Sequence, residues 1–255
     1  MTDLHVVTWG DGDDVVLVHG SISWGEETWA AQRPLGEEYR LIVPDRRGFG
    51  ASPGPDAGDF ERDAHDVAEL LPDRAHLVGH SYGGVASLLA AAMRPDAVRS
   101  LTVIEPPAFA LARGNEAVEE LIRRIVAAKG EARDPAEYVQ RFLRGFGFAP
   151  PLVRLKAMAL RCAASSWRER APWEAELPLD ALRAAPFPTL VVRGAWDVAP
   201  PEAQRVGRSA FHAVCDVLVD RLGAESAAIT GANHSVPRVG GTFNERLRAF
   251  WATAG

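Results

Sequence analysis

A serine lies between two glycines in the stretch Gly79-His80-Ser81-Tyr82-Gly83, directly after an apolar run and before an alanine- and leucine-rich stretch. In a sharp turn from a strand into a helix, this G-x-S-x-G pattern lifts the serine hydroxyl clear of the sheet. The serine then needs a positive φ, and side chains two residues before and after it would collide, so glycine is required at both places. We therefore expect Ser81 to be a nucleophile at the end of a strand.

A serine hydroxyl is a weak nucleophile at neutral pH and needs an adjacent base, which in turn needs a carboxylate to orient it. Among the seven histidines, His234 is the best candidate because it follows the last strand-like run in the stretch "GANHSVP". Asp197, in a turn after the run "TLVVRG", is the expected carboxylate. Glu105, which ends the run "LTVIE", is a rival that could reach the histidine from the same sheet edge, and is otherwise a pocket or hinge carboxylate.

Short apolar runs recur along the chain, separated by turn signals. Runs without polar alternation are typical of strands buried on both faces, as in a parallel sheet covered by helices. They occupy 15–20, 41–45, 75–80, 101–105 and 189–194, with a weaker one at 226–230 and an alternating, edge-like one at 5–9. Helical patterns occupy 59–71, 83–95 and 239–252. The alternation predicts an α/β fold with a mostly parallel sheet sandwiched by helices.

One section, 106–186, has no strand-like run and is bracketed by prolines at both ends. Its apolar spacing predicts three helices, over 115–129, 135–145 and 151–167. We therefore expect a core domain formed by 1–105 and 187–255, with 106–186 inserted between two core strands as an all-helical cap.

Five stretches carry a resemblance to a known family, and they occur in that family's order over nearly the whole chain. The stretches are "VHGS" (18–21), "PDRRGFGAS" (44–52), "GHSYGG" (79–84), "RGAWDVAPP" (193–201) and "GANHSVP" (231–237). The chain resembles the α/β-hydrolase superfamily, of the lidded esterase and carbon–carbon-bond hydrolase type. The resemblance implies that Ser81 is the nucleophile, His234 the base and Asp197 the acid.

The same resemblance implies an oxyanion hole made of the backbone N–H groups of Tyr82 and Ser21, with Ile22 as the alternative second donor. The arginines of "DRRGFGAS" are expected to pin a loop beside the site rather than to bind substrate. Several further side chains are candidates for contacts with a mostly apolar substrate, because they neighbour the site or lie in the helical section. They are Ile22, Trp24, Glu105, Phe109, Trp196 and Val198.

These residues predict a serine hydrolase that cleaves a small or medium ester, thioester or lactone through an acyl-enzyme. The alternative is a non-hydrolytic, carbon–carbon-bond-cleaving or cyclising enzyme on the same fold, since one scaffold hosts many reactions. A ligand-binding protein that kept the triad is the third hypothesis. Serine at the position of the nucleophile argues against a haloalkane dehalogenase or an epoxide hydrolase, which form an alkyl ester on a carboxylate.

The composition of the chain limits the classes of partner and cofactor that we expect it to bind. The chain has 255 residues, a net charge of -6 and 47% hydrophobic residues, so we expect a small-molecule substrate rather than nucleic acid or a membrane surface. We expect no cofactor and no metal, because no Cys/His cluster has ligand spacing, and two reduced thiols at Cys162 and Cys215. No signal peptide or apolar span is visible, which predicts a cytoplasmic protein. The arginine bias suggests a high-GC bacterium, and a homodimer is left open.

Overall fold

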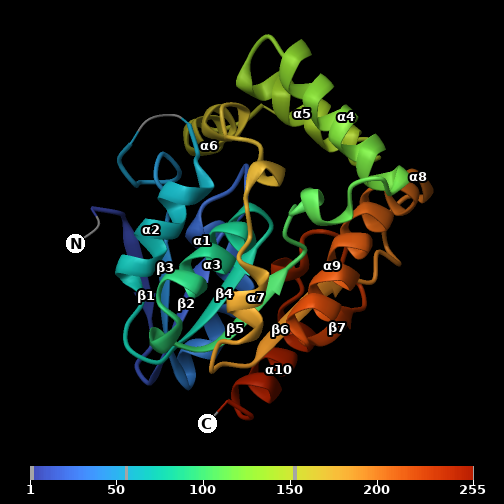
Figure 1. Ribbon diagram of the computed structural model, residues 1–255. Helices are drawn as coiled ribbons and strands as arrows, with labels where there is room; N and C mark the ends of the chain where they lie inside the picture. The colour runs from blue at the N-terminus through green and yellow to red at the C-terminus, as the bar shows by residue number, and fades with distance from the viewer. Residues whose placement is uncertain (1–2, 55–56, 152–153, 255) are drawn as a thin grey trace.

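The computed structural model describes residues 3–54, 57–151 and 154–254. Its centre is a seven-stranded sheet in the order β1-β3-β2-β4-β5-β6-β7, in which β1 pairs antiparallel with β3 and the other pairs are parallel (Figure 1). The strands are β1 (Val6–Trp9), β2 (Asp13–Val18), β3 (Tyr39–Pro44), β4 (Ala75–His80), β5 (Val98–Ile104), β6 (Thr189–Gly194) and β7 (Glu225–Ile229). The predicted α/β sheet is confirmed, and the predicted edge strand pairs antiparallel with its neighbour.

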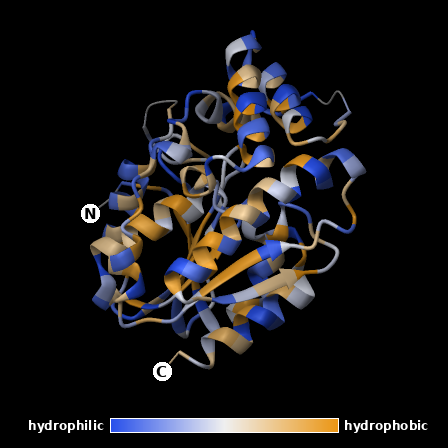
Figure 2. Cartoon of the chain, turned by 45° about the vertical axis from the view of Figure 1, so that its right-hand side comes forward, coloured by the Kyte–Doolittle hydropathy of each residue, from blue (hydrophilic) through white to orange (hydrophobic). Residues whose placement is uncertain are grey.

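Both faces of the sheet are buried, as the unbroken apolar runs predict. In β2, Val16 and Val18 face one hydrophobic core, while Val15 and Leu17 face the other. Helices α2 (Phe60–Leu70), α3 (Tyr82–Met93), α7 (Leu179–Arg183) and α9 (Ser209–Leu222) cover the first face, and α1 (Gly25–Trp29) and α10 (Gly240–Trp251) cover the second. Figure 2 shows the hydrophobic strands enclosed between these helical layers.

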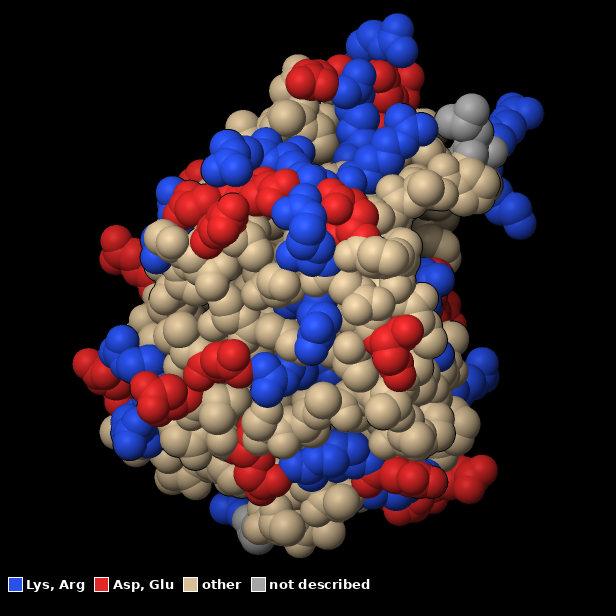
Figure 3. Space-filling model, turned by 90° about the vertical axis from the view of Figure 1, so that its right-hand side faces the viewer, with Lys and Arg blue, Asp and Glu red and all other residues tan. Residues whose placement is uncertain are grey.

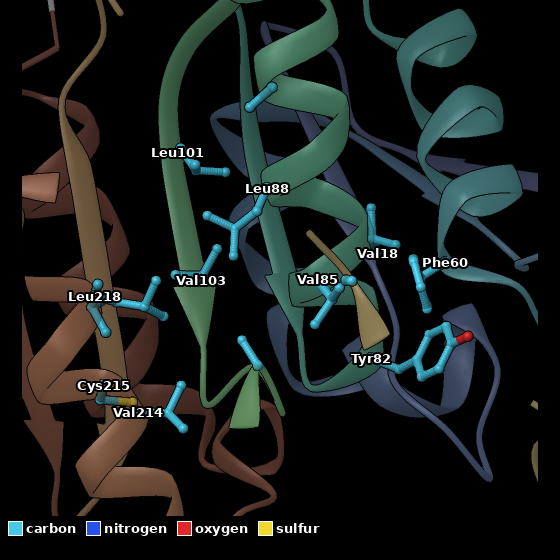
Figure 4. Close-up of a cluster of buried hydrophobic side chains, with 14 of the residues drawn as sticks. Val18, Phe60, Tyr82, Val85, Leu88, Leu101, Val103, Val214, Cys215 and Leu218 are labelled. Atoms are coloured by element: carbon cyan, nitrogen blue, oxygen red, sulfur yellow. The ribbon is translucent and has the colours of Figure 1, made fainter. Parts of the chain in front are cut away.

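Local signals fix where the covering helices begin and end. Asp59 caps α2, because its side chain accepts hydrogen bonds from the backbone N–H groups of Glu61 and Arg62. Helix α3 ends just before Pro95, and α9 ends at Gly223 in the left-handed conformation that glycine adopts without strain. Figure 4 shows side chains of α3 and α9 packed over β5.

The section between β5 and β6 contains α4 (Glu116–Glu131), α5 (Pro135–Gly145) and α6 (Ala157–Trp167), which lie above the sheet in Figure 1. The first two match the predicted helices closely. The third begins at Ala157 rather than at Pro151, and residues 152–153 lie outside the described ranges. Helix α7, at the end of the section, packs against α3 and α9 on the sheet. The division into a core domain and a cap stays a prediction.

Short elements connect the larger ones. They are the 3-10 helices at Ala30–Glu37, Pro95–Ala97, Phe109–Ala112, Pro172–Glu174 and Val236–Arg238, α8 (Pro201–Ala203), and a π-helical turn at Gln204–Arg208. In Figure 3, acidic and basic side chains lie together where the helical section meets the rest. Ion pairs that Arg205 forms with Glu120 of α4 and with Glu202 of α8 link the helical section to the segment after β6.

Two features bear on the composition-based expectations. Cys162 and Cys215 are both free, as predicted, and both are buried. Within the described ranges, no helix is long and apolar enough to cross a membrane, and no three His, Cys, Asp or Glu residues are grouped so that they could hold a metal ion.

Candidate active site

Ser81 lies in the sharp turn between β4 and α3, with φ 53° and ψ -124°. A Cβ atom at Gly79 would lie 2.4 Å from Ser87 Oγ, and one at Gly83 would lie 2.3 Å from the backbone oxygen of His19. Glycine is therefore required on both sides, and the predicted positive φ of Ser81 is confirmed. The turn carries the serine to the carboxyl end of the central strand.

His234 lies beside the serine, in the loop that follows β7. Its Nε2 is 2.9 Å from Ser81 Oγ, and its ring stacks on Phe211 with the centroids 4.2 Å apart. His80 contacts the backbone oxygen of His234 through its Nε2, at 2.8 Å. The structure thus brings the predicted nucleophile and base into direct contact and fixes the imidazole by stacking.

The carboxylate that contacts His234 belongs to Glu105, whose Oε2 is 2.8 Å from His234 Nδ1. Glu105 is fully buried and follows directly after β5, with φ 40°. Its other oxygen, Oε1, accepts hydrogen bonds from the backbone N–H of Gly194 (2.9 Å) and from Trp196 Nε1 (2.8 Å). With Nδ1 donating to the carboxylate, Nε2 is left as the acceptor that faces the serine hydroxyl.

The expectation that Asp197 orients the histidine is wrong. Asp197 is exposed, and its carboxylate accepts a hydrogen bond from the backbone N–H of Gly231 at 3.0 Å. It therefore links the loop after β6 to the loop that carries His234 without touching the imidazole. One sequence signal pointed to Glu105 instead: a carboxylate that ends a buried apolar strand needs a buried partner, because an isolated charge is costly in the interior.

Burial acts on both members of the pair. It lowers the pKa of the His234 imidazole, so the ring is neutral and able to accept a proton. Burial also raises the pKa of the Glu105 carboxyl, whereas the hydrogen bonds from Trp196 and Gly194 lower that pKa. The three groups around the carboxyl are all N–H donors, and this donor set fits the ionised form.

The loop before α1 lies directly against the nucleophile, since a Cβ atom at Gly20 would be 2.8 Å from Ser81 Cβ. Tyr82 is the first residue of α3, so its backbone N–H has no acceptor within the helix. The backbone N–H of Ile22 donates to Ser166 Oγ at 2.7 Å. Because that donor is occupied, the geometry favours Ser21 over Ile22 as the partner of Tyr82 in an oxyanion hole.

A buried arginine holds this loop in place. Arg46 donates to the backbone oxygen of Gly20 (3.1 Å), to Asp63 (2.6 Å) and to Glu169 (2.6 Å). Glu169 also accepts a hydrogen bond from the hydroxyl of Ser21, at 2.5 Å. The arginine of "DRRGFGAS" thus pins the loop beside the site, as predicted, and Glu169 ties that loop to the helical section.

Two cavities meet at Ser81. The first, of about 140 Å³, lies beneath the helical section and has mostly apolar walls that include Phe109, Phe142 and Phe146. The second, of about 320 Å³, is more polar and is lined by His234, Ser23, Glu27, Thr28 and Arg238, among others. Ser21 lines both cavities, whereas His234 lines the second and not the first.

Of the predicted substrate contacts, Phe109 lies in the wall of the first cavity and Ile22 in that of the second. The other expectations need correction. Trp196 is fully buried behind Glu105, Val198 is 63% exposed, and Trp24 lines neither cavity. Glu105 also lines neither cavity, because its carboxylate faces the histidine.

Comparisons with known proteins find similar proteins both by sequence and by structure. The model of the "Alpha/beta hydrolase family" matches residues 15–240. A pimeloyl-[acyl-carrier protein] methyl ester esterase from Aeromonas hydrophila is 32% identical over 189 residues, which cover 70% of this chain and 67% of that protein. The enzyme of the same name from Methylococcus capsulatus is 35% identical over 144 residues, 55% of each chain, so this alignment spans about half of that relative.

Solved structures extend the likeness to nearly the full length. A thermophilic esterase from Thermogutta terrifontis is 27% identical, with a TM-score of 0.64, and the match covers 97% of this chain and 93% of that one. An alpha/beta hydrolase from Sphaerobacter thermophilus is 23% identical, with a TM-score of 0.67 and 96% coverage of both chains. The second likeness concerns the fold alone.

Proposed function

Because the chain belongs to the alpha/beta hydrolase family, we propose that it is a serine esterase in which Ser81 is the nucleophile, His234 the base and Glu105 the orienting acid. The observation that carries the proposal is the continuous contact from Ser81 Oγ through His234 to the buried Glu105 carboxylate, at 2.9 and 2.8 Å. The curated relatives, which are methyl ester esterases by name, support cleavage of an acyl–oxygen bond.

The first half of the reaction forms an acyl-enzyme. His234 Nε2 takes the proton of the serine hydroxyl while Ser81 Oγ attacks the ester carbonyl carbon. The carbonyl oxygen becomes an oxyanion that the backbone N–H groups of Tyr82 and Ser21 stabilise. The imidazolium, held by Glu105, then gives its proton to the departing alkoxide as the bond between the carbonyl carbon and that oxygen breaks.

The second half repeats the steps with water. His234 takes a proton from water, the resulting hydroxide attacks the acyl carbon, and the serine oxygen leaves with the proton returned by the imidazolium. Each oxyanion-hole donor contributes about 10²–10³ in rate, and general base catalysis contributes about 10²–10⁴. The N-terminus of α3, which points at the turn, adds a partial positive charge near the oxyanion.

The two cavities suggest how the ester lies. The imidazolium must reach the leaving oxygen, and His234 lines the polar cavity rather than the apolar one. The alcohol part therefore belongs in the polar cavity. The acyl part then occupies the apolar cavity under the helical section, where Phe109 and its aromatic neighbours contact it. Thioesters and lactones present the same carbonyl and fit the same scheme.

The test compares the wild-type protein with Ser81→Ala on p-nitrophenyl butyrate and with a fluorophosphonate probe. We expect the wild type to hydrolyse the ester and to take up one equivalent of probe, and Ser81→Ala to do neither while keeping its melting temperature. Ser209→Ala, at an exposed serine that starts α9, is the matched control and should behave as wild type. Labelling of Ser81 without turnover of any acyl substrate would favour the non-hydrolytic alternative.

A further inference from the structure

Lys129 places a positive charge in the wall of the apolar cavity. It lies in the last turn of α4 and is one of two lysines in the chain. Its ammonium donates to the backbone oxygen of Glu169, a residue that lines the same cavity, so the charge lies at the cavity wall. Within the described residues, no carboxylate oxygen lies within 4.0 Å of the ammonium, the limit for an ion pair.

The charges around Lys129 are already engaged with other groups. The two carboxylate oxygens of Glu169 accept from Arg46 and from Ser21. Arg170, the other cation in the cavity wall, pairs with Asp59, Glu61 and Glu174. Among the described residues, Lys129 therefore differs from Arg170 in forming no ion pair, although the carboxylates of Glu169 and Glu174 attract its charge from farther away.

This arrangement has an energetic consequence. Burial lowers the pKa of the Lys129 ammonium, because the charged form loses hydration. A charged group in such a setting gains from an anion that it can contact directly, since apolar walls weaken the screening by water. In the part of the chain that the structure describes, no carboxylate contacts the Lys129 ammonium directly, and the cavity that it faces also contains the nucleophile.

A single residue, Glu169, contacts both Lys129 and the loop that carries Ser21, so its size limits the distance between them. Glu169 contacts Ser21 through Oε2 and Lys129 through its backbone oxygen. Covalent bond lengths allow at most roughly 7 Å between those two oxygens. The cavity of about 140 Å³ has room for roughly ten water molecules at ~10–15 Å³ each. An acyl chain of about six carbons, roughly 6 Å long between its end carbons, fits these limits.

We propose that Lys129 binds a carboxylate at the far end of a short acyl group, so that the enzyme prefers monoesters of dicarboxylic acids over esters of simple fatty acids. The inference rests on the proposed esterase function, because it assumes that the acyl part enters the apolar cavity. In this arrangement the ester carbonyl lies at Ser81 and the oxyanion hole, the methylene chain contacts the aromatic wall, and the terminal carboxylate accepts hydrogen bonds from the ammonium.

The kinetic test uses two methyl esters that differ only at the chain end, monomethyl adipate and methyl hexanoate, with acid release followed by titration. We expect kcat/KM to be about 10- to 100-fold higher for the adipate ester, the range of a hydrogen bond to a charged group. Lys129→Met should make kcat/KM equal for the two esters, by raising KM for the adipate ester. Lys129→Arg should keep much of the preference for that ester. Lys156→Met, at the other lysine, is the matched control and should leave the ratio unchanged.

A binding measurement separates this inference from the esterase proposal. Calorimetry with the Ser81→Ala protein should give a Kd for monomethyl adipate about 10-fold or more below that for methyl hexanoate, and adding Lys129→Met should remove the difference. A failure to hydrolyse either ester, with this binding preference intact, would sink the esterase proposal alone. Equal Kd values for the two esters, or a preference that survives Lys129→Met in a folded protein, would overturn the role of Lys129.

Discussion

Replacing Glu105 by glutamine tests the assignment of the acid most directly. The three groups around the carboxylate are His234 Nδ1, the backbone N–H of Gly194 and Trp196 Nε1, at 2.8, 2.9 and 2.8 Å. All three donate, and a carboxylate can accept from all of them. A glutamine of the same shape has one oxygen and one NH2 group. On one side, therefore, its NH2 group must point at another N–H donor.

The magnitude follows from which side the oxygen takes. If the amide oxygen faces Gly194 and Trp196, which offer two donors, the NH2 group faces His234 Nδ1. The imidazole then carries its proton on Nε2 and cannot accept the proton of Ser81. A wrong tautomer in a serine–histidine–carboxylate set costs about 10⁴ in kcat, which corresponds to about 5.4 kcal/mol at 1.36 kcal/mol for each factor of ten. We expect Glu105→Gln to lose kcat on this scale with little change in KM.

Asp197→Asn is the matched control, because it makes the same chemical change in the other candidate acid. The amide oxygen of an asparagine can still accept from the backbone N–H of Gly231, and the site is exposed. We expect its kcat to stay within about tenfold of wild type, since the hydrogen bond at stake contributes ~0.5–1.5 kcal/mol and a factor of ten in rate corresponds to about 1.36 kcal/mol. Steady-state kinetics on p-nitrophenyl butyrate, with melting temperatures for both variants, would refute the reasoning if Asp197→Asn were the inactive one.

Two further predictions concern groups behind the site. Trp196→Phe removes one hydrogen-bond donor to the ionised carboxylate and thereby raises the pKa of Glu105. The acidic limb of the pH profile of kcat/KM should therefore move upward by about 1–2 pH units. An acidic limb at an unchanged or lower pH would contradict this. Gly83→Ala should lower the free energy of unfolding by about 3 kcal/mol or more, because the added Cβ meets the backbone of His19. Gly130→Ala, in α4 with open space around it, should instead raise the free energy of unfolding by about 0.5–1 kcal/mol. Urea unfolding measures both changes.

The fold could be predicted because its signals are local. A parallel strand buried on both faces must be apolar throughout, so runs such as 75–80 and 189–194 were visible without knowledge of their neighbours. The start of α6 was not predictable in the same way. The apolar spacing carried the predicted helix back to residue 151, but the helix begins at Ala157 without a side-chain cap.

The nucleophile and the base were also predictable, since each follows a strand that ends at the same sheet edge. The acid was not, because two carboxylates follow adjacent strands at that edge. What separates them is the direction of each side chain, which the backbone conformation decides. Glu105 has φ 40° and is fully buried against the histidine, whereas Asp197 lies beyond Trp196 on the exposed side of its loop. The position of Glu105 at the end of a buried apolar strand signals that it has a buried partner, but residue type and spacing do not encode the backbone angle that aims its side chain at the histidine.

Backbone strain explains more generally why the directions of the site's side chains could not be inferred from the sequence. Five non-glycine residues in the described ranges have a positive φ, and four of them surround the site: Ile22, Ser81, Glu105 and Trp196. Such conformations cost roughly 1–3 kcal/mol each, a large sum against a total stability of about 5–15 kcal/mol.

Each of these four residues is held by a hydrogen bond from its own backbone N–H to a neighbouring element. Ser81 donates to Ile104 at 2.8 Å, Glu105 to Val192 at 3.0 Å and Trp196 to Ala232 at 2.7 Å, while Ile22 donates to Ser166. The bonds of Ser81 and Glu105 run from the residue just after one strand to the neighbouring strand, and the bond of Trp196 runs from the loop after β6 to the loop after β7. The sheet therefore stabilises the turns that aim the serine and the glutamate at the histidine, and a conformation fixed by partners far along the chain cannot be inferred from local sequence.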